Sequence, residues 1–521
     1  MIRGTMALMD RALRVDSRSV RGHLIRFLFV GLIVWCLVVT QLQAMLISAA
    51  GLEFVRSMIT IALFLITLGG VSLFATAITE EKEEQTLGLL RMAGVGPASL
   101  LLGKGVTRIL IALLILAAQF PFMLLGITLG GVLIHQVWAA YVAICAYLIM
   151  IGNAGLFVSV IFRTSRMASF TMTLALLVYF FGPWLLQMVL ASAIAVGNVD
   201  PTGAFAANAD RILQKLSAAN IFVRSGVIFS SGFSEPLISF QVVFHTISAG
   251  VFFLLSWLSF DYFNREERGG EAERPLFGRR TGKPHWIAVP RTWPNALVWK
   301  DFFFAGGGWT LMVAKFILYG LIILGVVIFV EAVSPNPSLS WDREVLGDIA
   351  IWVSLVLLFA ELCIYSSRIF RDEIRHRTLS SIAMLPTSIP ALVYSKWLGC
   401  LLATVPALTY FFAGVFLSPE DFFFVLEEFA DEPGFYYLLM QFVVGFHLCT
   451  LLSMYIKYGS VAVTVALLFV GNILTVMTVQ MLTWGTSDGE AFFVLGCMAS
   501  MALTAILHAG VILRVGVMAQ R

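Results

Sequence analysis

"SMITIALFLITLGGVSLFATAITEEKEE" occupies residues 57–84 and joins two kinds of sequence. Residues 57–79 carry no charge, and the next five, Glu80–Glu84, are all charged. An uncharged run of this length can cross about 30 Å of hydrocarbon as an α-helix. The stretch therefore predicts a membrane-spanning helix that ends in a charged segment.

Similar apolar runs recur along the whole chain. The 521 residues are 59% hydrophobic and 12% charged, whereas soluble domains carry about 25% charged residues. Lipid cannot satisfy backbone polar groups, so each run is expected to be helical, and the short alternating segments of a β-barrel are absent. The predicted class is an all-α polytopic membrane protein with about twelve spans, near 27–47, 57–79, 109–130, 136–162, 168–196, 237–260, 313–333, 349–370, 397–418, 434–456, 459–484 and 491–513.

The distribution of basic residues predicts the orientation of these spans. With the N-terminus in the cytoplasm, 29 of the 34 Lys and Arg residues fall on the cytoplasmic side and five on the outer side. Lys and Arg concentrate on the cytoplasmic side of membrane proteins, whereas acidic residues have little influence. We therefore expect a multi-pass protein of the cytoplasmic membrane with both termini in the cytoplasm.

The chain also resembles itself at a fixed offset. Residues 372–396 match residues 80–104 without a gap at six of 25 positions, all shifted by 292. The identical pairs are Glu81 and Glu373, Thr86 and Thr378, Leu87 and Leu379, Met92 and Met384, Leu100 and Leu392, and Lys104 and Lys396. We infer two six-span halves, 1–263 and 301–521, arranged as two six-helix repeats.

Each half contains one charged segment between its second and third spans, at 80–97 and 371–390. We call these segments the first and second elbow. The region 264–300 between the halves is charged and rich in Gly and Pro, which predicts a cytoplasmic linker. In the first elbow the apolar residues Leu87 and Leu90 recur at helical spacing, so a short helix at the membrane interface is expected.

The first elbow resembles the E-[KR]-E-x-x-T-L-x-x-L-L…GK signature of type 2 ABC transporter permeases, the membrane subunits of ATP-driven exporters. The second elbow keeps part of this pattern but has Arg375 at the position of the second glutamate. "WPNALVWKDF" at 293–302 is similar to the segment that precedes the first span in that family.

The resemblance implies that the elbows are coupling helices, which dock onto a separate ATP-binding subunit, expected as a dimer. The second and fifth spans of each half would line the transport route. Lipid and an unidentified substrate would be the other partners, and no nucleic acid is expected. The coupling residues implied are Glu81, Glu83, Thr86, Leu87, Leu90, Lys104, Glu373, Thr378, Leu379 and Lys396.

The chain itself is not expected to be an enzyme or to bind ATP. A phosphate-binding loop requires G-x-x-x-x-G-K-[ST], and the two Gly-Lys pairs, Gly103-Lys104 and Gly282-Lys283, lack both the first Gly and the Ser or Thr. The six Cys are scattered without a CxxC motif or a Cys/His cluster, so no metal or other cofactor is predicted.

Glu361 is an acidic residue near the middle of a predicted span, 349–370. An acid in a membrane costs roughly 3 kcal/mol on insertion scales and is a functional candidate by default. Glu361 is therefore a candidate for the translocation path, and the alternative is a structural hydrogen bond to Tyr365 or another helix. Two other functions remain open from the sequence: a 6+6 secondary transporter, and a membrane-embedded enzyme or scaffold.

Overall fold

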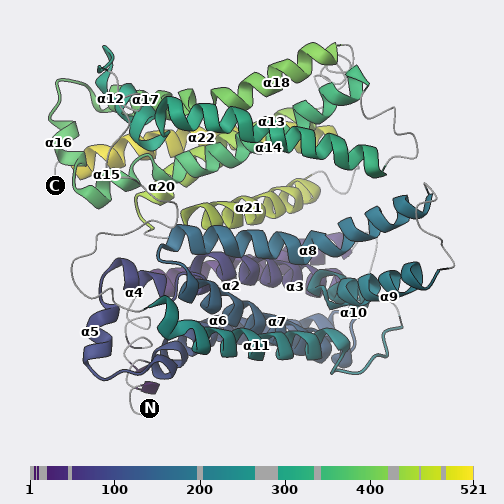
Figure 1. Cartoon of the computed structure of the whole chain (residues 1–521). Coiled ribbons are helices and arrows are strands. Elements are labelled where there is room, and N and C mark those ends of the chain that lie inside the picture. Colours follow the sequence, from purple (N-terminus) through teal and green to yellow (C-terminus); the bar gives the residue numbers. More distant parts are fainter. Residues whose placement is uncertain are drawn as a thin grey trace. The chain divides into compact units, whose positions relative to one another are not determined.

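A computed structural model describes the chain over residues 5–6, 9–10, 14, 20–44, 50–195, 203–230, 232–264, 291–333, 342–419, 433–456, 459–482 and 489–519. Every regular element in these residues is a helix (Figure 1). The chain divides into two compact units. The first comprises Met1–Met188, Thr202–Arg268 and Phe469–Ser487, and the second comprises Val189–Pro201, Gly269–Leu468 and Asp488–Arg521.

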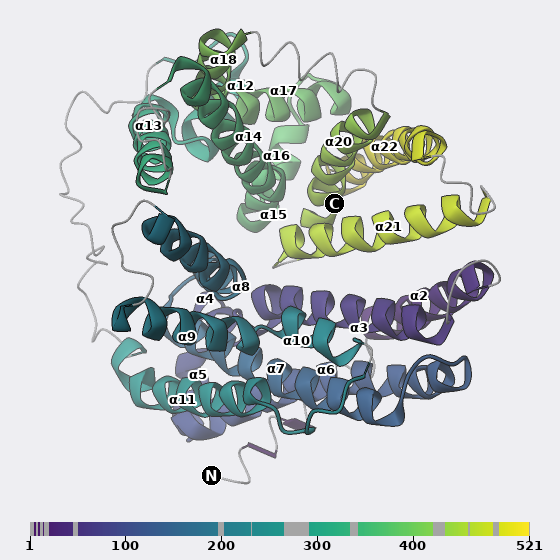
Figure 2. The ribbon, with the colours of Figure 1, turned by 90° about the vertical axis from the view of Figure 1, so that its right-hand side faces the viewer.

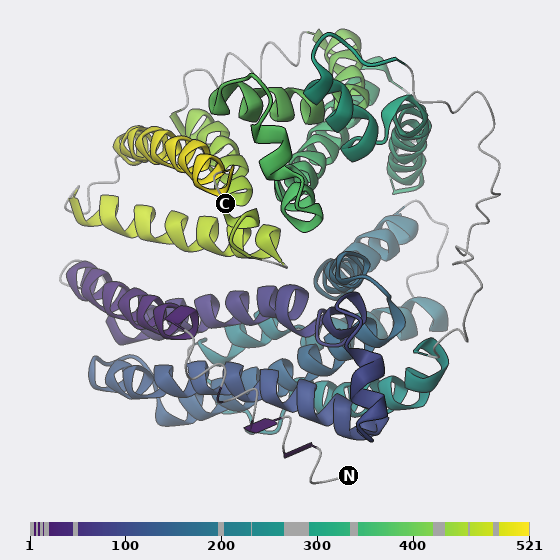
Figure 3. The same ribbon diagram turned by 90° about the vertical axis from the view of Figure 1, so that its left-hand side faces the viewer.

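The first unit is a bundle of long helices with short helices at its two ends. Its elements are α2 (Val20–Ala44), α3 (Ala50–Gly69), η1 (Gly70–Phe74, a π-helix), α4 (Thr79–Glu83), α5 (Leu87–Met92), α6 (Pro97–Thr128), α7 (Ile134–Ile161), α8 (Ser165–Ala195), α9 (Ala204–Ala219), α10 (Ile221–Ile228) and α11 (Phe240–Phe263). Helix α7 packs against α6 and α11, and α3 packs against α2 and α6 (Figure 3). Helices α4 and α5 lie at one end of the bundle, opposite α9 and α10 (Figure 1). Figure 2 is seen from the end that carries α9, with α4 and α5 behind it.

The second unit has a similar order of elements. They are α12 (Ala296–Lys300), η3 (Asp301–Ala305, a π-helix), α13 (Gly308–Val333), α14 (Arg343–Arg368), α15 (Arg371–His376), α16 (Leu379–Ala383), α17 (Ile389–Leu402), α18 (Val405–Leu417), α20 (Pro433–Ser453), the first part of α21 (Ser460–Leu482) and α22 (Gly489–Ala519). Two helices are divided between the units, because α21 belongs to the first unit from Phe469 on and α8 belongs to the second unit from Val189 on. Helix α14 packs against α13, α18 and α20, and α20 packs against α22.

Each of the twelve apolar runs coincides with a helix or a pair of helices, but twelve spans are not confirmed. Among the described residues, eight helices are long and apolar enough to cross a membrane, or nine if α17 and α18 form one span. The described apolar parts of α2, α20 and α21 are shorter, covering Phe29–Gln41, Leu439–Ser453 and Ser460–Asn472. The predicted linker falls largely on 265–290, outside the described residues.

Glycines allow the long helices to approach each other closely. A Cβ on Gly51 of α3 would lie 2.1 Å from the carbonyl oxygen of Gly126 on α6. A Cβ on Gly347 of α14 would lie 2.9 Å from the carbonyl oxygen of Gly414 on α18. Small residues at such contacts are typical of helix packing in membranes, where close backbone approach replaces the hydrophobic effect.

Candidate functional site: the two elbows

The first elbow consists of α4 and α5 joined by a tight turn, rather than one amphipathic helix. The amide of Gln85 donates to the carbonyl of Lys82 (3.2 Å), and the amide of Thr86 donates to the carbonyl of Glu81 (3.0 Å). These two bonds define a Schellman motif, with Gln85 left-handed at φ 56°. A non-glycine residue keeps this conformation only where its surroundings enforce it.

The second elbow has the same turn. The amide of Arg377 donates to the carbonyl of Ile374 (3.3 Å), and the amide of Thr378 donates to the carbonyl of Glu373 (3.0 Å). Arg377 is left-handed at φ 55°. Among the described residues, Arg377 and Gln85 are the only non-glycine residues with positive φ, and they lie 377 − 85 = 292 positions apart.

A carboxylate joins the turn of the first elbow to the helix that follows it. The hydroxyl of Thr86 donates to one oxygen of Glu81, and the ammonium of Lys104 on α6 forms an ion pair with the other. The Glu81 side chain is 14% exposed and that of Lys104 is 28% exposed. Glu81 is therefore mostly buried, and its two contacts hold the turn against α6.

The corresponding carboxylate of the second elbow lies in a larger and more buried cluster. Thr378 donates to Glu373, and the ammonium of Lys396 on α17 lies 3.0 Å from the other Glu373 oxygen. The Lys396 side chain is only 1% exposed and also contacts both carboxylate oxygens of Asp301, at 3.0 and 3.1 Å. Lys300 lies 2.5 Å from Glu373, so two ammonium groups face two carboxylates. Burial raises the pKa of the Asp301 carboxyl above its ordinary value, although Lys396 opposes this.

Lys82 attaches the first elbow to the end of α7. Its ammonium donates to three backbone carbonyls at 2.5–3.2 Å, those of Ser159, Val160 and Phe162. The hydroxyl of Ser159 accepts hydrogen bonds from two backbone amides at the start of the elbow, those of Ile78 (2.6 Å) and Thr79 (3.0 Å). The C-terminal carbonyls of a helix lack partners within the helix, so Lys82 caps α7.

Glu83 attaches the same elbow to the start of α8. One Glu83 oxygen accepts a hydrogen bond from the amide of Ser165 (2.7 Å), the first residue of that helix. The hydroxyl of Ser165 lies 3.0 Å from that of Thr79. Lys82 and Glu83 together hold the α7–α8 corner against the elbow.

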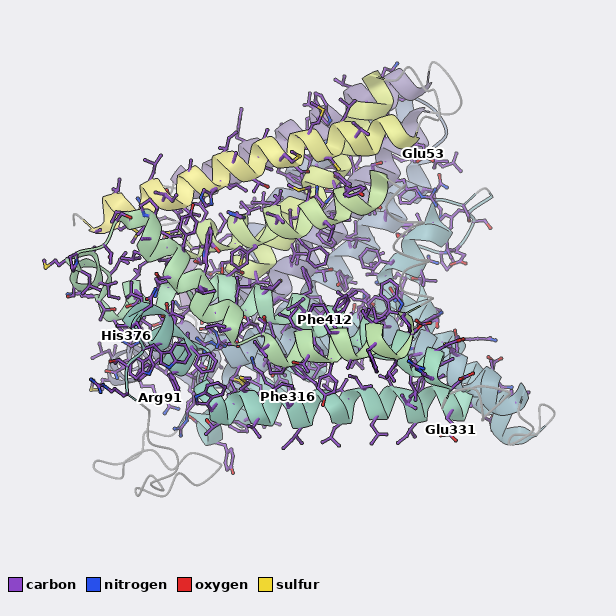
Figure 4. The ribbon with its side chains drawn as sticks, turned by 90° about the horizontal axis from the view of Figure 1, so that it is seen from above. Glu53, Arg91, Phe316, Glu331, His376 and Phe412 are labelled. Carbon is purple, nitrogen blue, oxygen red and sulfur yellow. The ribbon has the colours of Figure 1, made fainter. Side chains whose placement is uncertain are left out.

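Arg91 attaches the other side of the first elbow to the end of α11. Its guanidinium lies 2.5 Å from the carboxylate of Asp261 and donates to the carbonyl of Asn264 (2.9 Å). Figure 4 labels Arg91. The first elbow therefore contacts the ends of α7, α8 and α11.

Some apolar side chains of the two elbows pack against the protein interior, and others are exposed. Leu87 and Leu90 pack on the buried cluster that includes Leu100, Leu101 and Phe260, and Leu379 is buried in the second unit. In contrast, Met92 is 79% exposed and Met384 is 84% exposed. Exposed apolar side chains at matching positions are available for contact with another molecule.

Glu361 lies apart from the elbows, in a polar cluster within the second unit. Its carboxylate accepts a hydrogen bond from Tyr319 and lies 2.5 Å from the ammonium of Lys315. Lys315 also donates to the hydroxyl of Tyr365 (2.6 Å) and to the carbonyl of Ala403 (2.9 Å). Tyr365 is therefore a partner of Lys315, whereas the hydroxyl bonded to Glu361 comes from Tyr319.

The structure brings most of the predicted elbow residues together. Glu81, Thr86 and Lys104 form one cluster, and Glu373, Thr378 and Lys396 form the other. Lys300, Asp301 and Lys315 were not predicted as site residues from the sequence. The "WKDF" segment at 299–302 was the one available signal for the first two, although nothing in it indicated their partners.

The described part of the chain is thus an all-helical protein with eight or nine helices able to span a membrane and two elbows of closely similar geometry. No protein-family model and no curated protein matches the chain.

Proposed function

We propose that the chain is the membrane-spanning subunit of an ABC transporter of the exporter class. In this proposal residues 1–263 and 301–521 are six-span halves related as an internal repeat, with both termini in the cytoplasm. A separate ATP-binding subunit docks on the elbows and supplies the energy that moves an unidentified substrate across the cytoplasmic membrane.

The observation that carries the proposal is the matching construction of the two elbows. Helices α4 and α15 begin 371 − 79 = 292 residues apart, α5 and α16 begin 379 − 87 = 292 apart, and α6 and α17 begin 389 − 97 = 292 apart. The left-handed residues share this offset, and so do the Glu, Thr and Lys that contact each other. Strained backbone that recurs at one site supports a functional role for that site.

The contacts divide the predicted coupling residues into two groups with different roles. Glu81, Thr86 and Lys104 bond to each other, so we assign them to the shape of the elbow rather than to the contact with the partner. The partner would instead meet the exposed face, whose most exposed large apolar side chains are Met92 and Met384. Flexible, polarizable Met side chains suit such a docking surface.

The test is assembly and transport with both exposed methionines replaced. The variant Met92→Asp/Met384→Asp should fail to retain the ATP-binding subunit in a pull-down and should lose ATP-driven transport in reconstituted vesicles. Its Tm should stay at the wild-type value because neither side chain is buried. The matched control is Met167→Asp, at a 49% exposed methionine near the start of α8, outside both elbows.

Wild-type assembly and transport in the double variant would refute docking on the elbows. A purified chain that hydrolyses ATP without any other protein would refute the assignment to a membrane subunit.

A further inference from the structure

The ammonium of Lys315 contacts three oxygens, two from α14 and one from the residue that follows α17. On α14 it lies 2.5 Å from the Glu361 carboxylate and 2.6 Å from the Tyr365 hydroxyl. It lies 2.9 Å from the carbonyl of Ala403, which follows α17. The ammonium also lies 5.1 Å from the centre of the Tyr365 ring, within the range of a cation–π contact. An ammonium has three N–H donors, and each has an acceptor here.

The Ala403 carbonyl lies where a membrane helix is broken. Helix α17 ends at Leu402, α18 begins at Val405, and the two are bent by 58°. A break within a membrane helix exposes backbone groups that lipid cannot satisfy, so another part of the protein must bond to them. The Lys315 ammonium does this for Ala403. In the first unit α6 runs unbroken from Pro97 to Thr128.

Helix α13 holds both sides of this break. Lys315 bonds to the end of α17, and the next residue, Phe316, accepts a hydrogen bond through its carbonyl from Tyr410 of α18 (2.8 Å). In Figure 4, Phe316 on α13 and Phe412 on α18 mark these two neighbouring helices. The bend is therefore anchored to α13 on both sides.

Glu361 has capacity for one more donor. Its first oxygen, Oε1, accepts from both Lys315 and Tyr319, whereas Oε2 is buried and has no hydrogen-bond partner. The residue is 5% exposed. Buried polar atoms are nearly always bonded, so an unpaired one calls for an explanation.

We propose that Glu361, Tyr365 and the Ala403 carbonyl form a binding site for a primary ammonium group, which Lys315 fills as a tethered occupant. The carboxylate supplies the counter-charge, the hydroxyl and carbonyl accept hydrogen bonds, and the Tyr365 ring covers one side. Removal of the Lys315 ammonium would free these acceptors, together with the unpaired Glu361 Oε2, for a small amine that lacks the tether. Occupation of the site holds the α17–α18 break in its bent form, as half-helices and exposed carbonyls do at cation sites in transporters.

The test removes the tether and supplies the ammonium separately. Purified Lys315→Ala protein is titrated with methylammonium chloride, and its Tm is compared with that in sodium chloride of equal ionic strength. Methylammonium at several times its Kd should raise the Tm of this variant by about 2–4 °C. The wild type should not respond, because Lys315 occupies the site. Lys315→Ala/Glu361→Gln should not respond either, because it lacks the counter-charge.

Three outcomes would overturn the site: no shift in folded Lys315→Ala, an equal shift in the wild type or the double variant, or an equal shift with tetramethylammonium, which has no N–H donor. Should Lys315→Ala fail to fold, Lys315→Gln takes its place, with hydrogen exchange at the amides of 403–408 as a second readout. Exchange should be faster in Lys315→Gln than in the wild type and should slow again with methylammonium. Unchanged exchange would also overturn the proposal. Because none of these measurements uses ATP or transport, they succeed or fail independently of the proposed function.

Discussion

Lys104 on α6 and Lys396 on α17 each form an ion pair with a glutamate of an elbow, so the same substitution can be tested in two environments. Lys104 and Lys396 occupy matching positions, but their side chains are 28% and 1% exposed. Replacing each with Met removes the charge and keeps a similar length. In the second elbow this leaves Asp301 and Glu373 facing Lys300 alone, so one buried negative charge lacks a partner.

The expected magnitudes differ because the two clusters differ in burial. Removing one member of a buried charge pair costs about 3–5 kcal/mol, whereas a partly exposed pair contributes about 0–1 kcal/mol. In a unit of this size 1 kcal/mol corresponds to about 2–4 °C in Tm, so Lys396→Met should lower the Tm by roughly 6–20 °C and Lys104→Met by at most about 4 °C.

The assay is a thermal unfolding scan of both variants in the same detergent, with a charge-restoring control. Lys396→Met/Asp301→Asn leaves one ammonium, Lys300, facing one carboxylate, Glu373, at 2.5 Å. This double variant should recover most of the lost stability. Equal losses for Lys104→Met and Lys396→Met, or no recovery in the double variant, would refute the reasoning from buried charge.

Three further predictions test individual contacts. Gln85→Gly and Arg377→Gly should each stabilise the protein by about 1 kcal/mol in equilibrium unfolding, since glycine adopts positive φ without strain; a loss at either position would contradict the left-handed turn. Lys82→Met should cost about 1–3 kcal/mol and speed hydrogen exchange near the end of α7, because three carbonyls lose their donor; unchanged exchange would show that Lys82 does not cap the helix. Burial raises the pKa of the Asp301 carboxyl in the folded state. The stabilisation that this carboxyl gives to the folded state is therefore fully present below its unfolded pKa and is lost as the pH rises through its folded pKa. The stability of the wild type relative to Asp301→Asn should therefore increase as the pH falls, and a difference that stays constant with pH would count against this.

Local patterns in the sequence predicted the helices and the position of the elbows. Each apolar run lies in a helix or a pair of helices, as expected for apolar segments that bond their backbone groups within the segment. The matches at Glu81, Thr86 and Lys104 identified residues that do contact each other. The pattern did not reveal that these contacts are internal, because a repeated motif can result from a conserved turn as well as from a shared partner.

The charge pairs between distant segments could not be predicted from the sequence. Lys300 and Glu373 are 73 positions apart, and Lys315 lies far along the chain from Glu361. The sequence left two sources of a partner for Glu361, namely Tyr365 on the same helix or another helix. The packing of α13 against α14 brings Tyr319 and Lys315 to that carboxylate, so the partners lie on another helix. Only tertiary structure selects among partners that are chemically equivalent.

The two elbows share a turn but are anchored to different elements. Lys82 and Glu83 attach the first elbow to the ends of α7 and α8. The matching positions in the second elbow are Ile374 and Arg375, and within the described residues neither side chain forms the corresponding hydrogen bond. The second elbow is attached instead to α12 and η3 through Lys300 and Asp301. On the proposed function, a force applied at Met92 would reach the α7–α8 corner, and one applied at Met384 would reach the segment before α13. The same docking event would then move different helices in each unit, and Glu83→Lys would disturb the fold of the first elbow as well as its docking. Substitutions at the exposed methionines separate these two effects because neither side chain is buried.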